Sequence, residues 1–209
     1  MSVSHRQKVR NIIRTLKRLY PRIRISLCFS SQWELMVAVI LSAQTTDVKV
    51  NHITKKLFKK HKTIRAYAQA SPREFMSDIR GVNYYKTKAR HIIAAAQKIV
   101  HQYGGKIPIT MGALTGLPGI GRKSANVIIN ECTKKPVGIV VDTHMIRLSR
   151  LMGLTSYKNP KNIELDLMRI VPQSEWRTFA LRLVQYGRDY CPARKHRHDL
   201  CPLEPYDAN

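Results

Sequence analysis

Apolar residues recur at helical spacing along nearly the whole of this 209-residue chain. In the first segment the repeating positions are Val9, Ile12, Leu16 and Leu19, and the pattern stops at Pro21. Residues three and four apart lie on one face of a helix, and proline does not continue one. The same pattern predicts helices over 33–43, 46–59, 64–70, from 72, 86–103, 123–131, 143–152, 159–170 and 174–186. A single short apolar run, 137–141, is a candidate for extended structure, so the sequence predicts an all-α fold of about ten helices.

Two glycines flank one apolar residue in a short turn just ahead of one predicted helix. Gly119, Ile120 and Gly121 form the turn, and the helix starts near Lys123. Glycine adopts backbone angles that side chains forbid, so such a turn can direct several N–H groups outward. Next to a helix N-terminus, those groups form a site for a phosphate. The sequence predicts that this turn and Arg122 bind a nucleic-acid backbone.

The charge of the chain also indicates a polyanionic partner. Lys and Arg total 37 against 13 Asp and Glu, a formal net charge of +24, and the basic residues are spread along the chain. One basic run alone, such as 55–62, could be a solvated helix face. The whole excess favours nucleic acid. A membrane is disfavoured because no lysine-rich helix carries a bare apolar face and no run of about 18 apolar residues occurs.

The chain start and the cysteines suggest a location inside the cell. The first residues lack the apolar core of a secretion signal. The four cysteines, at 28, 132, 191 and 201, are too few and too irregular for a disulfide scaffold. We expect a monomer in the cytoplasm, associated with the nucleoid if the source is prokaryotic.

Lys123 and Asp142, nineteen residues apart, suggest catalysis rather than binding alone. A neutral amine beside a bound backbone can attack the sugar C1′ and form a Schiff base. A carboxylate can stabilise the positive charge on the sugar or take a proton from the amine. Each residue alone has an ordinary explanation, since Lys123 could be a surface residue and Asp142 a helix N-cap. The pair together with the glycine turn favours an enzyme.

Four segments, in this order and spacing, resemble the endonuclease III family of helix-hairpin-helix DNA glycosylases. The resemblance runs from about Gln32 to Cys201, and its motifs are specific. The segments are 41–47 (LSAQTTD), 85–89 (YKTKA), 117–127 (LPGIGRKSANV) and 141–144 (VDTH).

The resemblance implies a two-domain, all-α architecture with a DNA cleft between the domains. A six-helix domain would span 22–131 and contain the helix-hairpin-helix. The second domain would combine 1–21 with 132–209.

The resemblance also implies roles for single residues. Lys123 matches the nucleophile of the family and Asp142 its essential carboxylate. Gln44 matches the side chain that fills the space left by a flipped base. A second wedge is expected near Val82, with Tyr84 as a rival, because the segment 81–88 is about two residues longer than the common form. The C-terminal loop suggests contacts from Lys195 and Arg197 to DNA phosphates.

The C-terminal loop departs from the family pattern of four cysteines that holds an iron–sulfur cluster. The family spacing is C-x6-C-x2-C-x5-C, whereas this chain has Cys191, His198, Cys201 and Asp207 at those positions. Iron–sulfur clusters are usually held by thiolates, so a standard cluster is not expected. Zinc accepts sulfur, nitrogen and oxygen ligands and is an alternative. We expect a loop held by packing, with no metal.

The combined prediction is a bifunctional DNA glycosylase/AP lyase of base excision repair. Its partner would be double-stranded DNA with oxidised or damaged pyrimidines or abasic sites. Lysine Schiff-base chemistry would remove the base, and β-elimination would cut the strand. Two alternatives remain: a mismatch or uracil-type glycosylase, and a non-catalytic, damage-sensing DNA-binding protein.

Overall fold

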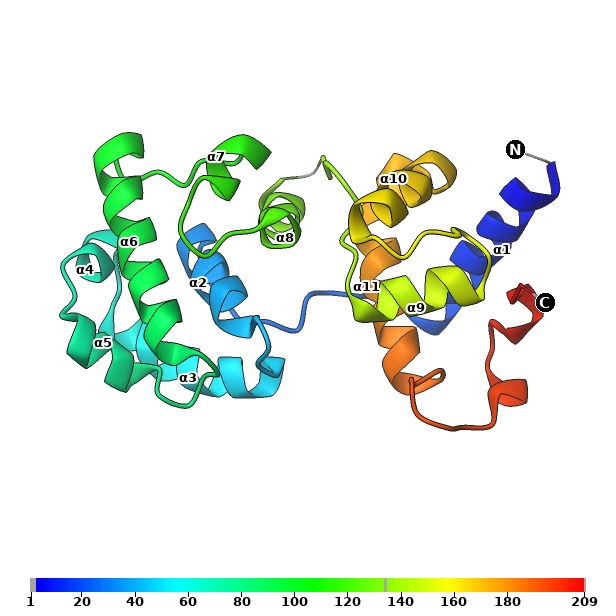
Figure 1. Ribbon diagram of the computed structural model, residues 1–209, viewed down its shortest axis with the longest axis horizontal. Coiled ribbons are helices and arrows are strands. Elements are labelled where there is room, and N and C mark those ends of the chain that lie inside the picture. The colour runs from blue at the N-terminus through cyan, green and yellow to red at the C-terminus, as the bar shows by residue number, and fades with distance from the viewer. Residues whose placement is uncertain (1–2, 134, 209) are drawn as a thin grey trace. The chain divides into compact units, whose positions relative to one another are not determined.

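The computed structural model describes residues 3–133 and 135–208, which form helices joined by turns and by longer loops (Figure 1). Within these residues no strand occurs, so the predicted all-α class is confirmed. The α-helices are α1 (Val3–Leu19), α2 (Gln32–Ser42), α3 (Asp47–Lys60), α4 (Ile64–Ala68), α5 (Pro72–Asp78), α6 (Tyr85–Tyr103), α7 (Met111–Thr115), α8 (Arg122–Cys132), α9 (Thr143–Leu151), α10 (Pro160–Ile170) and α11 (Trp176–Asp189). Three short 3-10 turns, η1 (Gln173–Glu175), η2 (His198–Leu200) and η3 (Glu204–Tyr206), complete the element order.

The chain divides into two compact units. The central unit is Ser26–Lys134, and the terminal unit joins Met1–Ile25 to Lys135–Asn209. The sequence placed these boundaries at 22–131 and at 1–21 with 132–209. Residues 1 and 2, part of the start that lacks a secretion-signal pattern, lie outside the described residues.

The central unit is built around α2, which is apolar on all sides. Its residues from Leu35 to Leu41 are buried, as expected for a helix with no polar face. Helices α3, α6 and α8 pack against it. Ser31 caps its start by accepting a hydrogen bond from the Glu34 backbone N–H.

The terminal unit brings both ends of the chain into one core. Helix α1 packs on α11, and α9 packs on α11 and α10. The Arg182 guanidinium on α11 donates a hydrogen bond from Nε to the Tyr20 carbonyl, 3.0 Å away, just after α1 ends. The buried core side chains include Ile12, Leu16, Met145, Leu148, Phe179 and Leu183.

Two local features differ from the predicted pattern. The short helix α7 was not predicted because Gly112 interrupts its apolar pattern, but Thr110 caps it through the Ala113 N–H. The run 137–141 forms no strand in the described chain, and Ile139 and Val141 instead enter the core of the terminal unit. A lone apolar segment without a neighbouring strand has no ladder to join.

No helix in the described part of the chain is long and apolar enough to cross a membrane.

Candidate nucleic-acid interface and active site

The glycine turn between α7 and α8 has one conformationally constrained position and one open position. Gly119 has a φ of +79°, and a Cβ added there would lie 3.0 Å from the His91 Cβ. Gly121 is the N-cap of α8 at a φ of −88°, and a Cβ there would meet nothing within 4 Å. The first N–H groups of a helix have no partner inside it, and Gly121 offers no side-chain cap. An outside anion can approach these groups closely.

Lys123 lies in the first turn of α8 and is exposed. The opposite side of α8 is buried at Ala125, Ile128 and Ile129, and this side holds the helix against α2. Among the described residues, the Lys123 amine has no hydrogen-bond or ion-pair partner. The amine therefore lies beside the glycine turn and is accessible.

Asp142 is the N-cap of α9 and is only partly buried. Its Oδ1 accepts a hydrogen bond from the Met145 backbone N–H at 2.9 Å. No described residue donates a hydrogen bond to its Oδ2. One carboxylate oxygen thus starts the helix, and the other is available for a substrate. Asp142 belongs to the terminal unit, whereas Lys123 belongs to the central unit.

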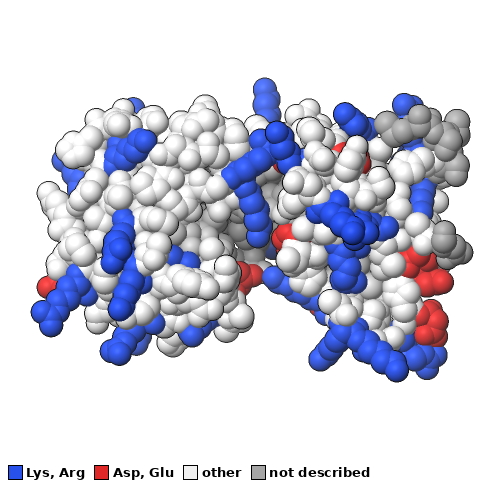
Figure 2. Space-filling view, viewed as in Figure 1, with Lys and Arg blue, Asp and Glu red and all other residues white. Residues whose placement is uncertain are grey.

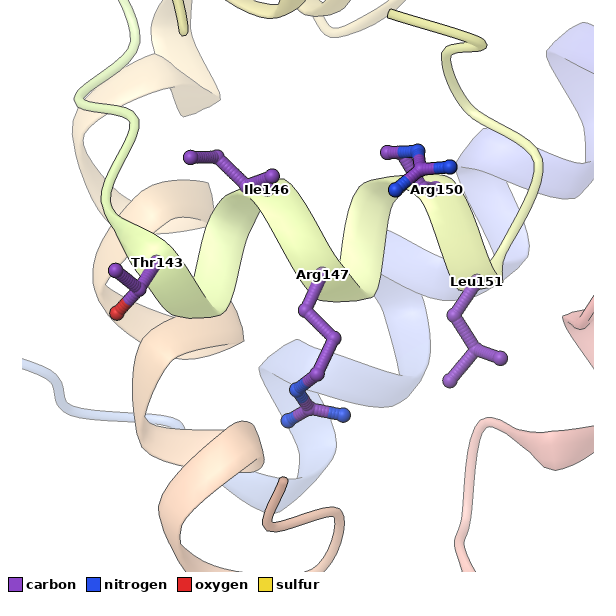
Figure 3. Close-up of a pocket in the computed structure, with 5 residues that line it drawn as sticks. All are labelled: Thr143, Ile146, Arg147, Arg150 and Leu151. Carbon is purple, nitrogen blue, oxygen red and sulfur yellow. The ribbon is translucent and has the colours of Figure 1, made fainter. Parts of the chain in front are cut away.

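A shallow pocket of about 680 Å³ lies along α9, directly after Asp142. Figure 3 shows that all its lining side chains leave this one helix, with Arg147 pointing away from Ile146 and Arg150. The pocket residues are Thr143, Ile146, Arg147, Arg150 and Leu151. Arg150 is exposed and adds a positive charge to this surface.

Gln44 lies in the turn between α2 and α3 with its side chain exposed. Its φ of +55° is unusual for a residue with a Cβ and costs about 1–2 kcal/mol. Two side chains hold this turn through its carbonyls. Lys88 Nζ donates to the Ala43 carbonyl and Asn83 Nδ2 to the Gln44 carbonyl, both at 2.5 Å.

Lys88 is a buried residue whose role the sequence reasoning missed. It is 5% exposed, and its Nζ also donates to the Leu41 carbonyl at 2.7 Å and lies 3.3 Å from Thr45 Oγ1. Burial lowers the pKa of this amine to about 8. Lys88 lies in the segment 85–89 that carried part of the resemblance, but nothing in the sequence showed that it points inward.

The structure does not place Val82 where a DNA wedge would be. Its side chain is 2% exposed, packed inside the central unit, so it cannot enter a duplex from this position. The neighbouring Tyr84 is 66% exposed and has a left-handed φ of +58°. Of the two candidates for the second wedge, Tyr84 is therefore the exposed one and Val82 the buried one.

Lys and Arg side chains are scattered over the visible face of both units and outnumber the acidic ones there (Figure 2). Lys195 and Arg197 are exposed on the C-terminal loop. Arg197 forms a two-point ion pair with Asp199, Nε to Oδ1 at 3.0 Å and Nη2 to Oδ2 at 2.8 Å. Both partners are exposed, so a phosphate can compete for this guanidinium.

The prediction that the C-terminal loop holds no metal was wrong. Ligand atoms of Cys191, His196, His198 and Cys201 all lie within 4.8 Å of one another, a group that can hold a metal ion. His196, and not Asp207, is the fourth member of this group. The Asp207 carboxylate instead contacts Nε2 of His198. His196 lies at none of the positions that the spacing of the family cysteines marks, so that spacing does not point to it.

Comparisons with known proteins agree with the geometry. Residues 37–173 match the family described as HhH-GPD superfamily base excision DNA repair protein. Endonuclease III from Synechocystis is 38% identical over 96% of this chain and 91% of its own length. A solved non-covalent endonuclease III–DNA complex aligns with a TM-score of 0.91 and 34% identity, covering 97% of this chain and 94% of the other. A trapped endonuclease III–DNA covalent intermediate aligns with a TM-score of 0.89 and 33% identity, covering 97% and 95%. The glycine turn with its lysine, the capping aspartate and these similarities over nearly the full length show that the chain belongs to the HhH-GPD superfamily and, within it, to the endonuclease III family.

Proposed function

We propose that this protein is a bifunctional DNA glycosylase/AP lyase that removes oxidised or ring-damaged pyrimidines from double-stranded DNA. The observation that carries the proposal is the accessible Lys123 amine in the first turn of α8, directly behind a glycine turn suited to a phosphate. A related structure is described as a trapped covalent intermediate with DNA, and it supports a nucleophile of this kind.

The proposed chemistry begins at the sugar of an extruded nucleotide. The neutral Lys123 amine forms a bond to C1′ while the glycosidic bond breaks, and the base leaves with the bonding electrons and takes up a proton. Asp142 accepts a proton from the attacking nitrogen. The C1′–O4′ bond then breaks, O4′ takes up a proton, and an open-chain iminium ion remains. Loss of a proton from C2′ then expels the 3′-phosphate by β-elimination. Hydrolysis of the iminium frees Lys123.

The Gln44 turn is the proposed support for the opened duplex. A base must leave the stack before its C1′ can be reached, and this costs a few kcal/mol. Gln44 would occupy the vacated space, and Tyr84 is the exposed candidate for a second contact. Lys88 acts as a positioning residue because its amine holds the carbonyls of Leu41 and Ala43, just before Gln44, and so fixes the Gln44 backbone.

The backbone contacts would come from the turn and the basic surface. Gly119, Gly121 and Arg122 would bind phosphates near the lesion, and Lys195 and Arg197 would bind others from the C-terminal loop. The protein would work as a monomer and, as a repair enzyme, in the cytoplasm of a prokaryotic cell at the nucleoid.

Borohydride trapping on a duplex with an abasic site or thymine glycol tests the proposal. The native protein should form a covalent adduct and Lys123→Ala should form none, because borohydride reduces only the Schiff base that this amine makes. Lys106→Ala is the matched control, since Lys106 is an exposed lysine remote in sequence from the glycine turn. An adduct that persists in Lys123→Ala would contradict the assignment.

The same assay separates the alternatives. Base release without an adduct or strand cut would indicate a monofunctional mismatch or uracil-type glycosylase. Tight binding of damaged DNA with neither reaction would indicate a non-catalytic sensor.

A further inference from the structure

The C-terminal loop brings two thiols and two imidazoles to one point in the terminal unit. Cys191 and Cys201 are buried, and His196 and His198 are partly buried. His196 Nε2 lies 3.2 Å from His198 Nδ1, and Cys191 Sγ lies 3.8 Å from the same nitrogen. Cys28 and Cys132 belong to the central unit and take no part in this group.

The two histidines face each other through one nitrogen each. His196 Nδ1 lies 2.9 Å from the Arg194 carbonyl, which can only accept, so this nitrogen donates the hydrogen bond. His198 Nε2 lies 2.5 Å from Asp207 Oδ2. The remaining nitrogens, His196 Nε2 and His198 Nδ1, lie 3.2 Å apart, and these are the two that a common metal ion could bind.

The surroundings of the group are those of a metal site. Asp207 orients His198 as carboxylates commonly orient metal-bound histidines. Arg147 of α9 donates from Nη1 to Cys191 Sγ at 3.4 Å and from Nη2 to the Cys191 carbonyl. These two hydrogen bonds tie the loop to α9. Cys201 Sγ donates its thiol hydrogen to the Tyr190 carbonyl, 3.1 Å away. Binding of a metal to this sulfur would release that hydrogen as a proton.

The group does not fit the four-iron cluster of the family. Such a cluster needs four cysteine thiolates spread around an eight-atom core. Here only two thiolates are present, and all four ligand atoms lie within 4.8 Å of one another. The edges of a tetrahedron around one zinc ion are about 3.3–3.8 Å for zinc–nitrogen and zinc–sulfur bonds of about 2.0–2.3 Å. The observed 3.2 Å and 3.8 Å separations are close to these edges.

We propose that Cys191, His196, His198 and Cys201 bind a single structural zinc ion in place of the cluster, with Asp207 and Arg147 as its outer partners. A closed site with four protein ligands and no open position is structural rather than catalytic. The ion would fix the loop that carries Lys195 and Arg197.

Metal content and a cobalt spectrum of the full-length protein test the proposal. Elemental analysis should find one zinc per chain, without inorganic sulfide and without the visible absorption of iron–thiolate chemistry. After chelation and reloading with cobalt(II), the protein should show the intense ligand-field bands of a tetrahedral site and a thiolate-to-cobalt charge-transfer band. These readouts do not depend on enzymatic activity.

Variants identify the ligands. His196→Ala and Cys201→Ser should lose the tetrahedral cobalt spectrum, whereas His101→Ala and Cys28→Ser, the matched exposed controls, should keep it. Asp207→Asn should retain the spectrum but bind zinc about 10–100-fold more weakly. Circular dichroism of each variant shows whether the remaining helices have folded.

Three results would overturn the assignment. Iron and sulfide in cluster proportions would show that two thiolates suffice for the family cofactor. Failure of the native protein to hold zinc or to give a tetrahedral cobalt spectrum would remove the site. An unchanged cobalt spectrum in a folded His196→Ala protein would exclude His196 as a ligand.

Discussion

At Asp142 one carboxylate combines a structural role with a proposed chemical one. Oδ1 starts α9 by accepting from Met145, and Oδ2 is left for the substrate. Asparagine caps helices about as well as aspartate, whereas alanine does not. Substitutions at this position can therefore separate stability from chemistry.

Asp142→Asn should keep the melting temperature near that of the native protein but lower the single-turnover rate of base release by about 10²–10⁴-fold, because the proton acceptor is lost. Asp142→Ala should lose the same chemistry and, in addition, about 1 kcal/mol of stability. Thermal unfolding and single-turnover kinetics on thymine glycol check both. If Asp142→Asn unfolds as easily as Asp142→Ala, the capping argument fails.

Lys88 should make the stability of the protein depend on pH. Its pKa is lowered to about 8 in the folded protein, against an ordinary value of 10.5. Between these values the unfolded chain holds the proton that the folded chain has released, so this residue makes stability rise with pH. The penalty for burying the charged amine is greatest below about pH 8 and declines above it.

The matched comparison is Lys88→Met, which keeps the length of the side chain and removes the titrating group. The native-minus-variant difference in unfolding free energy should increase from pH 7 to 9.5, as measured by urea unfolding. At every pH the variant should also lose about 1–3 kcal/mol, because two carbonyls lose their donor. A difference that is flat or falls with pH would contradict the lowered pKa.

At the scale of the elements, the two glycines of the turn before α8 have different structural requirements. Gly119 needs its glycine because its φ is positive and His91 lies against it, whereas Gly121 has an ordinary φ and nothing near it. Gly119→Ala should therefore destabilise the protein by about 1–2 kcal/mol or more. Gly121→Ala meets no clash and should cost about 0.5–1 kcal/mol, because alanine is a poorer N-cap than glycine.

DNA binding should respond differently from stability at this turn. Gly121→Ala places a methyl group where a phosphate would approach, so it should weaken binding to an abasic-site duplex while the protein stays folded. Fluorescence anisotropy beside thermal unfolding measures both properties. If Gly121→Ala bound the abasic-site duplex as tightly as the native protein, the phosphate would not bind at Gly121.

At the scale of the whole molecule, charge should dominate affinity for DNA. The net charge of +24 is distributed over both units (Figure 2). With about 6–10 phosphate contacts, affinity should fall about 10³–10⁵-fold between 50 and 200 mM salt. Removing a single phosphate contact, as in Lys195→Ala, should lower the slope of log affinity against log salt by about 1. A flat salt response would contradict an interface made mainly of backbone contacts.

Much of the helical pattern could be predicted because it depends on local spacing. Helix α1 ends close to the predicted position, and helices α6 and α9 both begin and end close to theirs, where Pro21, Gly104 and Asp142 supply stop or start signals. The short α7 was missed, since five residues with a glycine carry too little periodicity. The segment 137–141 was predicted as extended because a short apolar run does not distinguish a buried strand from another buried segment.

The sequence by itself determined the all-α class, the family and the candidates Lys123, Asp142 and Gln44, because these rest on local periodicity and on motifs of fixed spacing. Tertiary structure alone decided which side chains face inward or meet across the chain. It buried Val82 and exposed Tyr84, and it placed Lys88 under the Gln44 turn. The fourth side chain in the group that could hold a metal is His196 and not Asp207, whose carboxylate instead contacts His198. Spacing along a loop does not specify which atoms converge in space, because that depends on how the loop folds back on the core.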